Sequence, residues 1–134
     1  MPHIYTHPFR DEAVTIDVGI LTRWGLDNGR PRLLNQTLLG LGGLPPLAIA
    51  PNGAVLALPA PTIKGDKEGQ MVEIRRWDDL AVDRVLLLPE SGVNLTAFAF
   101  SPDGRWLATA DFHERIYLID RMTGQVADVC QWSR

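Results

Sequence analysis

The sequence predicts an all-β protein built from about three consecutive four-stranded antiparallel sheets. Stretches of alternating apolar and polar residues indicate strands, because successive strand side chains point to opposite faces. Turn sequences separate these stretches at short intervals, and one strand–turn–strand pattern occurs twice. The chain of 134 residues contains ten prolines and twelve glycines, which suits many tight turns. No stretch keeps the 3.6-residue period of an amphipathic helix for long.

The clearest unit spans residues 95–129. Its first strand, LTAFAF at 95–100, is apolar on both faces, so we expect it to be buried on both sides. Pro102, Asp103 and Gly104 then form a turn, because proline fixes φ, aspartate bonds the local backbone and glycine accepts a positive φ. Three further strands are expected at residues 105–110, 116–120 and 125–130.

The first two thirds of the chain repeat this organisation less clearly. Asn28-Gly29 favours the positive-φ turn of a hairpin. The first twelve residues carry a weak signal, limited to a short strand at Ile4 and Tyr5. Residues 59–70, PAPTIKGDKEGQ, interrupt the pattern and are expected to form an exposed, mobile loop. The other expected strands are 13–18, 20–24, 30–40, 47–50, 54–58, 71–80 and 84–88.

An internal repeat is the main feature of the sequence. Residues 50–57 (APNGAVLA) align with residues 101–108 (SPDGRWLA), 51 positions later. We also expect Trp24, Trp77 and Ile119 to share one place at the end of a third strand. The residues that carry the repeated pattern are Trp24, Pro51, Asn52, Gly53, Trp77, Asp78, Ser101, Pro102, Asp103, Gly104 and Asp120.

These residues resemble the WD-repeat family of β-propellers, whose blades hold four strands in about 40–45 residues. The most similar segments are FSPDGRWLATA at 100–110 and IRRWDD at 74–79, whose Trp77-Asp78 matches the dipeptide that names the family. The resemblance implies a partial propeller with units at about 1–40, 41–89 and 90–134, the first of them degenerate. The family's glycine–histidine pair is absent before the second and third units, so its Asp–His–Ser/Thr–Trp network is not expected there.

The number of units has a consequence of its own. Propellers typically close with 4–8 blades, and three are too few to close a ring. The chain is then a piece of a longer propeller, a truncated product, or a protomer that completes its ring by association. Three blades leave an uncovered face at each end, so we expect self-association through these open edges, aggregation, or a need for further blades.

Composition excludes several classes of partner. The net charge of −3 and the lack of a lysine or arginine run give no reason to expect a nucleic-acid partner. No apolar run approaches the roughly 20 residues that cross a bilayer, and the N-terminal residues do not resemble a signal peptide. One cysteine, Cys130, fits a reducing compartment. We therefore expect a cytoplasmic protein.

Few residues suggest catalysis or ligand binding. His3, His7 and His113 are too scattered for a metal site, so we interpret them as surface or loop residues. Cys130 is expected to be a packed thiol, and the turn explains Asp103. We expect no cofactor, a core role for Trp77 and a solvated charge at Asp78.

The sequence favours a non-catalytic scaffold that binds other proteins, with the 59–70 loop as a candidate partner site. The charged residues of that loop are Lys64, Asp66, Lys67 and Glu68. A propeller enzyme is the rival hypothesis, but the expected innermost strands, LTAFAF and LPPLAIA, carry no ionisable group. A third hypothesis is a sensing or regulatory propeller segment of a larger protein, such as a kinase or protease.

Overall fold

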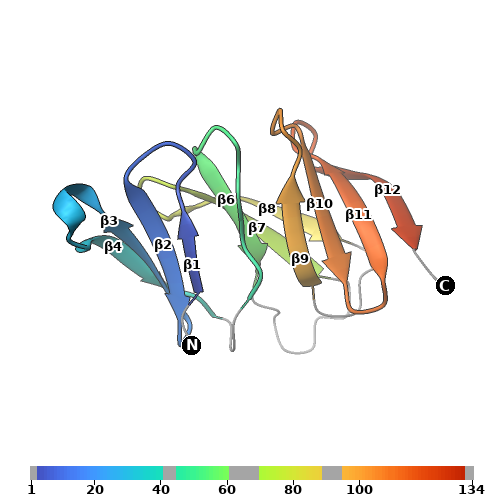
Figure 1. Cartoon of the computed structure of the whole chain (residues 1–134). Helices are drawn as coiled ribbons and strands as arrows, with labels where there is room; N and C mark the ends of the chain where they lie inside the picture. The colour runs from blue at the N-terminus through green and yellow to red at the C-terminus, as the bar shows by residue number, and fades with distance from the viewer. Residues whose placement is uncertain (1–2, 41–44, 61–69, 89–94, 132–134) are drawn as a thin grey trace.

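The structure, a computed structural model, describes residues 3–40, 45–60, 70–88 and 95–131. These residues form three four-stranded antiparallel sheets that lie side by side like consecutive propeller blades (Figure 1). The predicted all-β fold is confirmed. The first sheet contains β1 (His3–Thr6), β2 (Glu12–Asp17), β3 (Ile20–Gly25) and β4 (Arg32–Leu38); the second β5 (Ala48–Ile49), β6 (Val55–Pro59), β7 (Gln70–Arg76) and β8 (Val82–Leu88); the third β9 (Leu95–Phe100), β10 (Trp106–Asp111), β11 (Arg115–Asp120) and β12 (Gln125–Gln131).

Each sheet is a meander in which every strand pairs with the next along the chain. The first sheet is complete, although the sequence predicted a degenerate unit. Its β1 pairs with β2 through partners such as Ile4 with Thr15 and Tyr5 with Val14. The sequence signal for β1 is weak because the strand has four residues and none of them is fully buried.

The second sheet is covered on both faces, and this makes it the centre of the molecule. Every residue of β6 is buried. Because strand side chains alternate, Leu56 and Leu58 pack against the first sheet and Val55 and Ala57 against the third. Burying a side chain the size of leucine contributes about 1.5–3 kcal/mol, so both boundaries between sheets stabilise the fold. The first boundary contains Val14, Ile16, Leu21, Leu39, Leu47, Leu56, Leu58, Trp77 and Leu80. The second contains Ala50, Val55, Ala57, Val72, Ile74, Leu86, Leu88, Leu95, Leu107, Tyr117 and Ile119.

The turn between the first two strands is closed by the same backbone hydrogen bond in all three sheets. The amide of its first residue donates to the carbonyl five residues later, at 2.8–2.9 Å, and a proline follows that first residue. The sequence revealed this repeat in two sheets only. The first copy, HPFRDE, was missed because Phe9 and Arg10 stand where the other two copies have asparagine or aspartate and then glycine. The equivalent pairs are His7–Glu12, Ala50–Val55 and Ser101–Trp106.

Strand pairing corrects the predicted position of Trp77. Trp24, Arg75 and Ile119 occupy equivalent places, opposite Ala13, Leu56 and Leu107 respectively. Trp77 lies two residues further on, beyond the end of β7, where its amide donates to the carbonyl of Ala54 at 2.9 Å. The predicted equivalence was wrong because it matched the Trp-Asp dipeptide rather than the distance from the preceding turn.

Strand β9 is not buried on both sides, contrary to the prediction. Ala97 and Ala99 are exposed, and only Leu95 is fully buried. An irregularity in the pairing with β10, at Ala110 and Asp111, leaves Thr96 unpaired and brings Leu95 to the face of Phe98 and Phe100. That face packs on the second sheet. The opposite face is open because the third sheet ends the row, which the sequence of one strand does not reveal.

Helical structure in the described residues is limited to one short turn, Asp27–Gly29, between β3 and β4. Its Asn28 and Gly29 have φ values of 64° and 70°, as predicted from the Asn-Gly pair. In the described part of the chain, no helix is long and apolar enough to cross a membrane.

Candidate functional site

Six turns lie along one edge of the three sheets, at the same end of their strands, because alternate turns of a meander lie at the same end of its strands. We call this end the turn surface, made of residues 7–11, 26–31, 50–54, 77–81, 101–105 and 121–124. Figure 1 shows the β1–β2, β5–β6 and β9–β10 turns side by side at the top. Hydrogen bonds join turns of neighbouring sheets, so this surface is held as a unit.

His7 joins the β1–β2 turn of the first sheet to the β5–β6 turn of the second sheet. Its ring nitrogen Nδ1 accepts hydrogen bonds from the amides of Phe9 and Arg10, at 3.2 and 3.0 Å. Nε2 therefore carries the hydrogen and donates to the carbonyl oxygen of Gly53, at 3.0 Å. The ring centroid lies 4.7 Å from that of Trp77. His7 lies in the β1–β2 turn, as the interpretation as a loop histidine expects, but it is 6% exposed and is therefore not a surface residue.

The sequence contained a signal for this role. His7 precedes a proline and begins a turn equivalent to those that begin at Ala50 and Ser101. Two of these three residues carry a polar side chain that bonds within or beyond its turn: His7 to Gly53, and Ser101 to Asp103 at 2.6 Å. Aligning HPFRDE with the other two turns would have placed His7 in the fold.

Trp77 and Glu12 connect the first two sheets beside His7. The Trp77 indole Nε1 donates to Glu12 Oε1 at 2.6 Å, and Arg23 Nη1 donates to the same oxygen at 2.7 Å. Arg23 Nη2 also donates to the carbonyl of Asp78, at 2.8 Å. Burial alone would raise the pKa of Glu12, but the bonds from Trp77 and Arg23 outweigh it and hold that pKa below its usual value. The predicted core role of Trp77, which is 1% exposed, is confirmed.

An ion pair is buried on the face of β7 that alternates away from Val72 and Ile74. Arg75 Nε lies 2.9 Å from Glu73 Oε1, and both side chains are about one-tenth exposed. Arg75 Nη1 also donates to the carbonyl of Leu80 at 2.7 Å. Such a pair is stable in a boundary of this kind because each charge has a partner of opposite charge.

Asp111 organises the turn between β10 and β11, at the other end of the third sheet. Its oxygens accept bonds from the amides of His113 and Arg115, from Arg115 Nε at 2.8 Å and from the Tyr117 hydroxyl at 2.9 Å. Burial raises the pKa of Asp111, but these bonds prevail and keep the pKa below its ordinary value. The carboxylate is therefore a structural anchor, and the sequence offered no signal for it.

The turn surface exposes large apolar side chains among paired charges, of which Phe9 and Met122 are more exposed than Leu26. Phe9 is 68% exposed and Met122 is 79% exposed. Arg10 pairs with Asp78 at 2.7 Å, which joins the first and second sheets. Other ion pairs here are Arg76 with Asp79 and Asp83, and Arg105 with Asp120.

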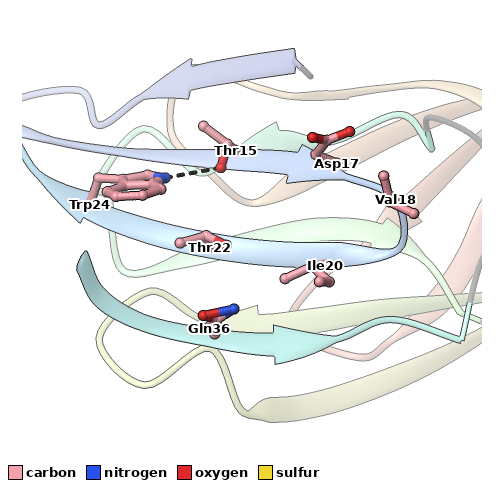
Figure 2. A pocket seen from close by; sticks show the side chains of 7 residues that line it. All are labelled: Thr15, Asp17, Val18, Ile20, Thr22, Trp24 and Gln36. Carbon is pink, nitrogen blue, oxygen red and sulfur yellow. Dashed lines mark hydrogen bonds between the residues drawn. The ribbon is translucent and has the colours of Figure 1, made fainter. Parts of the chain in front are cut away.

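The first sheet has an open face on the side away from the second sheet. Figure 2 shows Trp24 lying along this face, with its Nε1 donating to Thr15 Oγ1 at 2.9 Å. Beside Trp24 is a shallow hollow of about 390 Å³. Ile4 lies on the same face because it pairs with Thr15, and it is 66% exposed. The hollow is lined by Thr15, Asp17, Val18, Ile20, Thr22, Trp24 and Gln36.

The third sheet has an open face at the other end of the row. Four alanines form its centre, as the pairs Ala97 with Ala110 and Ala99 with Ala108. Trp106 lies on the same face, and the Arg105 guanidinium lies 4.9 Å from the centre of its ring. Asp120 lies on this face opposite Trp106, and Asp128 lies on it opposite Leu118.

The repeated motif residues serve the turns. Gly53 and Gly104 adopt φ values of +72° and +74°, as the turn interpretation requires. Asn52 and Asp103 each accept a bond from the amide two residues later, at 3.0 Å. Pro51 and Pro102 follow the first residue of their turns, Asp120 accepts from the Met122 amide at 2.9 Å, and Asp78 is exposed and paired with Arg10.

Two other predictions have different outcomes. Cys130 is exposed, so its interpretation as a packed thiol was wrong. It lies on β12, the outermost strand of a sheet with one open face. The predicted partner loop residues Lys64, Asp66, Lys67 and Glu68 lie outside the described residues.

In the residues that the structure describes, no three His, Cys, Asp or Glu side chains are grouped to hold a metal ion. No protein-family model matches the chain, and no curated protein matches it significantly. The candidate site therefore consists of the turn surface and the two open sheet faces.

Proposed function

We propose that the chain is a non-catalytic, WD-repeat-like propeller scaffold that binds another protein through its turn surface. The observation that carries this proposal is the exposure of Phe9 and Met122 among the arginine–aspartate pairs of that surface. Aromatic residues, methionine and arginine are enriched in protein interfaces and supply much of their binding energy.

The anchoring of the turns supports the same proposal. His7 bonds to Gly53, Arg10 pairs with Asp78, and Arg84 Nη1 donates to the carbonyl of Arg121 at 2.8 Å. Each contact joins turns or strands of neighbouring sheets. A surface that is already ordered loses less conformational entropy when a partner binds.

The likeness to WD-repeat proteins rests on the row of four-stranded blades and their repeated turn. The Trp77-Asp78 dipeptide adds little to it, because Trp77 lies two positions beyond the place of Trp24 and Ile119. A single cysteine supports a cytoplasmic location for this scaffold.

A capture experiment with matched variants tests the proposal. The tagged chain, the double variant Phe9→Ser/Met122→Ser and the control Phe112→Ser would each be cross-linked to cell proteins. Phe112 is 75% exposed but lies in the β10–β11 turn, at the opposite end of the sheets. Candidates captured by the wild type would then be purified, and their affinity measured by calorimetry.

We expect one partner to bind the wild type and Phe112→Ser equally and the double variant at least about tenfold more weakly. Equal binding by all three proteins would refute the turn surface as the site. A Phe112→Ser variant that alone loses the partner would move the site to the opposite end.

A further inference from the structure

We infer that two copies of this chain close a six-bladed ring, in which the open face of each third sheet packs on the open face of the other copy's first sheet. The inference concerns the sheet faces and does not depend on the turn surface. Within the chain, the back of the first sheet packs on the front of the second, and the back of the second on the front of the third. In the ring, the back of the third sheet packs on the front of the other copy's first sheet in the same way.

Each sheet of the row has a front face, toward the preceding sheet, and a back face, toward the next. Ile4, Leu47 and Phe98 are equivalent residues of the front faces. Each comes directly before the first-strand residue (Tyr5, Ala48 or Ala99) that pairs with an equivalent residue of the second strand (Val14, Ala57 or Ala108). Leu47 is 7% exposed and packs on the first sheet, and Phe98 packs on the second. Ile4 has the same place but is 66% exposed, because no sheet precedes it in the described chain.

The back faces show the complementary pattern. Val14, Ala57 and Ala108 are equivalent, opposite Tyr5, Ala48 and Ala99. Val14 and Ala57 are completely buried against the following sheet. Ala108 is partly exposed, and its neighbour Ala99 is fully exposed. The chain therefore has one unmatched front and one unmatched back.

The two open faces are complementary in shape. Alanines 97, 99, 108 and 110 leave an area of short side chains on the inner half of the third sheet, and Trp106 lies at the end of that area nearest the turn surface. The inner strand of the first sheet presents Ile4, which projects from its front face. A front residue of this size fits a back face of alanines, as Phe98 fits the boundary that contains Ala50 and Ala57.

Charge favours the same arrangement. On the back of the second sheet, Arg84 reaches the β11–β12 turn of the third sheet. Asp128 occupies the equivalent place on the third sheet, since Leu118 pairs with Asp128 as Ile74 pairs with Arg84. The turn that it would meet in a second copy, β3–β4 of the first sheet, contains the exposed Arg30, while Arg32 at the start of β4 pairs with Asp27 at 3.4 Å. Asp128 and Arg30 would thus bring opposite charges together at this edge of the interface.

The number of blades in the described chain favours a second copy as the occupant of the open faces. Propellers typically close with 4–8 blades, so two three-bladed chains make a ring within that range and three chains exceed it. Both junctions of a two-copy ring are the same front-on-back contact, related by a twofold axis. Association stops at two because no face remains open.

The solution mass tests the inference, measured by sedimentation over a wide range of protein concentration. We expect twice the 14.9 kDa of one chain. Two variants each block one face at an exposed position that the isolated fold tolerates: Ile4→Arg on the front and Ala99→Arg on the back. Circular dichroism and the melting temperature verify that each variant is folded.

Each variant alone should be monomeric, because each ring junction needs one front and one back. A mixture of the two should form a dimer held by one junction, since the Ala99→Arg front and the Ile4→Arg back remain intact. Its second junction carries both arginines, so this mixed dimer should be weaker than the wild-type dimer. A back-to-back dimer would instead persist in Ile4→Arg, and a front-to-front dimer in Ala99→Arg; either result would overturn the inference.

Two other results would also overturn it. A wild-type chain that stays monomeric at high concentration would leave the open faces to further blades of a longer protein. A mass that grows without limit would indicate an open filament instead of a ring. The variant Phe9→Ser/Met122→Ser should keep the wild-type mass, so that failure of the ring and failure of the turn-surface proposal remain distinguishable.

Discussion

The indole Nε1 of Trp77 donates a 2.6 Å hydrogen bond to Oε1 of Glu12, across the boundary between the second and first sheets. The two residues are 65 positions apart in the chain. Their bond, together with that of Arg23 to the same oxygen, fixes the orientation of one sheet relative to the other.

Replacing Glu12 by glutamine should weaken this boundary. Glutamine keeps an acceptor for Trp77 but removes the negative charge that Arg23 requires. Removing one partner of a part-buried, charge-assisted hydrogen bond costs about 1–3 kcal/mol. Urea unfolding of Glu12→Gln should show a loss of this size, while the exposed control Glu114→Gln should change little. Equal stability of the two variants would show that the ion pair contributes nothing.

Gly53 and Gly104 provide a matched pair of substitutions, because they occupy equivalent turns with φ values of +72° and +74°. Alanine at position 104 would meet Arg121 and Pro51 at ordinary distances of 3.6 and 3.7 Å. Only the positive φ then penalises Gly104→Ala, by about 1–2 kcal/mol. Alanine at position 53 would also overlap the buried ring of His7.

We therefore expect Gly53→Ala to cost at least about 2 kcal/mol more than Gly104→Ala, because overpacking adds to the backbone strain. Thermal and urea unfolding of both variants measure the difference. Similar losses in the two would mean that the His7 ring moves aside without cost, and that its bond to Gly53 is weak.

Acid should destabilise the third sheet through Asp111. The pKa of Asp111 is held below its ordinary value in the folded protein, so the unfolded chain binds the proton more readily. Its contribution is complete above about pH 5 and is lost as the pH falls through about 4 and below. Glu12, whose pKa is also lowered, acts in the same direction.

The variant Asp111→Asn isolates this contribution. It should be less stable than the wild type at pH 7, by about 1–3 kcal/mol, because Arg115 loses its charged partner. The difference should shrink at pH 3, below the ordinary aspartate pKa, because the unfolded wild-type chain then binds a proton at Asp111 more readily than the folded protein does. Urea unfolding at both values measures it, and a difference independent of pH would contradict the role of the charge.

Shortening the segment between β6 and β7 should leave the fold intact. Pro59 pairs with Val72, and the amide of Ala60 donates to the carbonyl of Met71 at 2.8 Å. The chain thus already reverses direction at this point, and a short linker can join its two sides. Replacing residues 62–69 with four glycine and serine residues should change stability by less than about 1 kcal/mol. A variant that loses the β-sheet circular dichroism spectrum would contradict this expectation.

The strands and turns of this protein were determined largely by local sequence. The strand-forming composition of the 13–18, 54–58 and 105–110 segments, and the turns at Asn28-Gly29 and Pro102-Asp103-Gly104, have physical causes that act within a few residues. The fold class and the conformations of Gly53 and Gly104 were therefore predictable. The weakest prediction was β1, which is short and half-exposed.

Tertiary structure alone decided which face of each sheet is covered and which polar groups meet. A period of two identifies two faces of a strand but says nothing about what lies against either, so β9 was wrongly expected to be buried on both sides. The positions of His7, Glu12 and Trp77 depend on contacts between residues 46 to 70 positions apart. Such contacts arise from the packing of one whole sheet on another. The turn repeat can locate His7 in its turn, but no local pattern in this sequence specifies its partner in the next sheet.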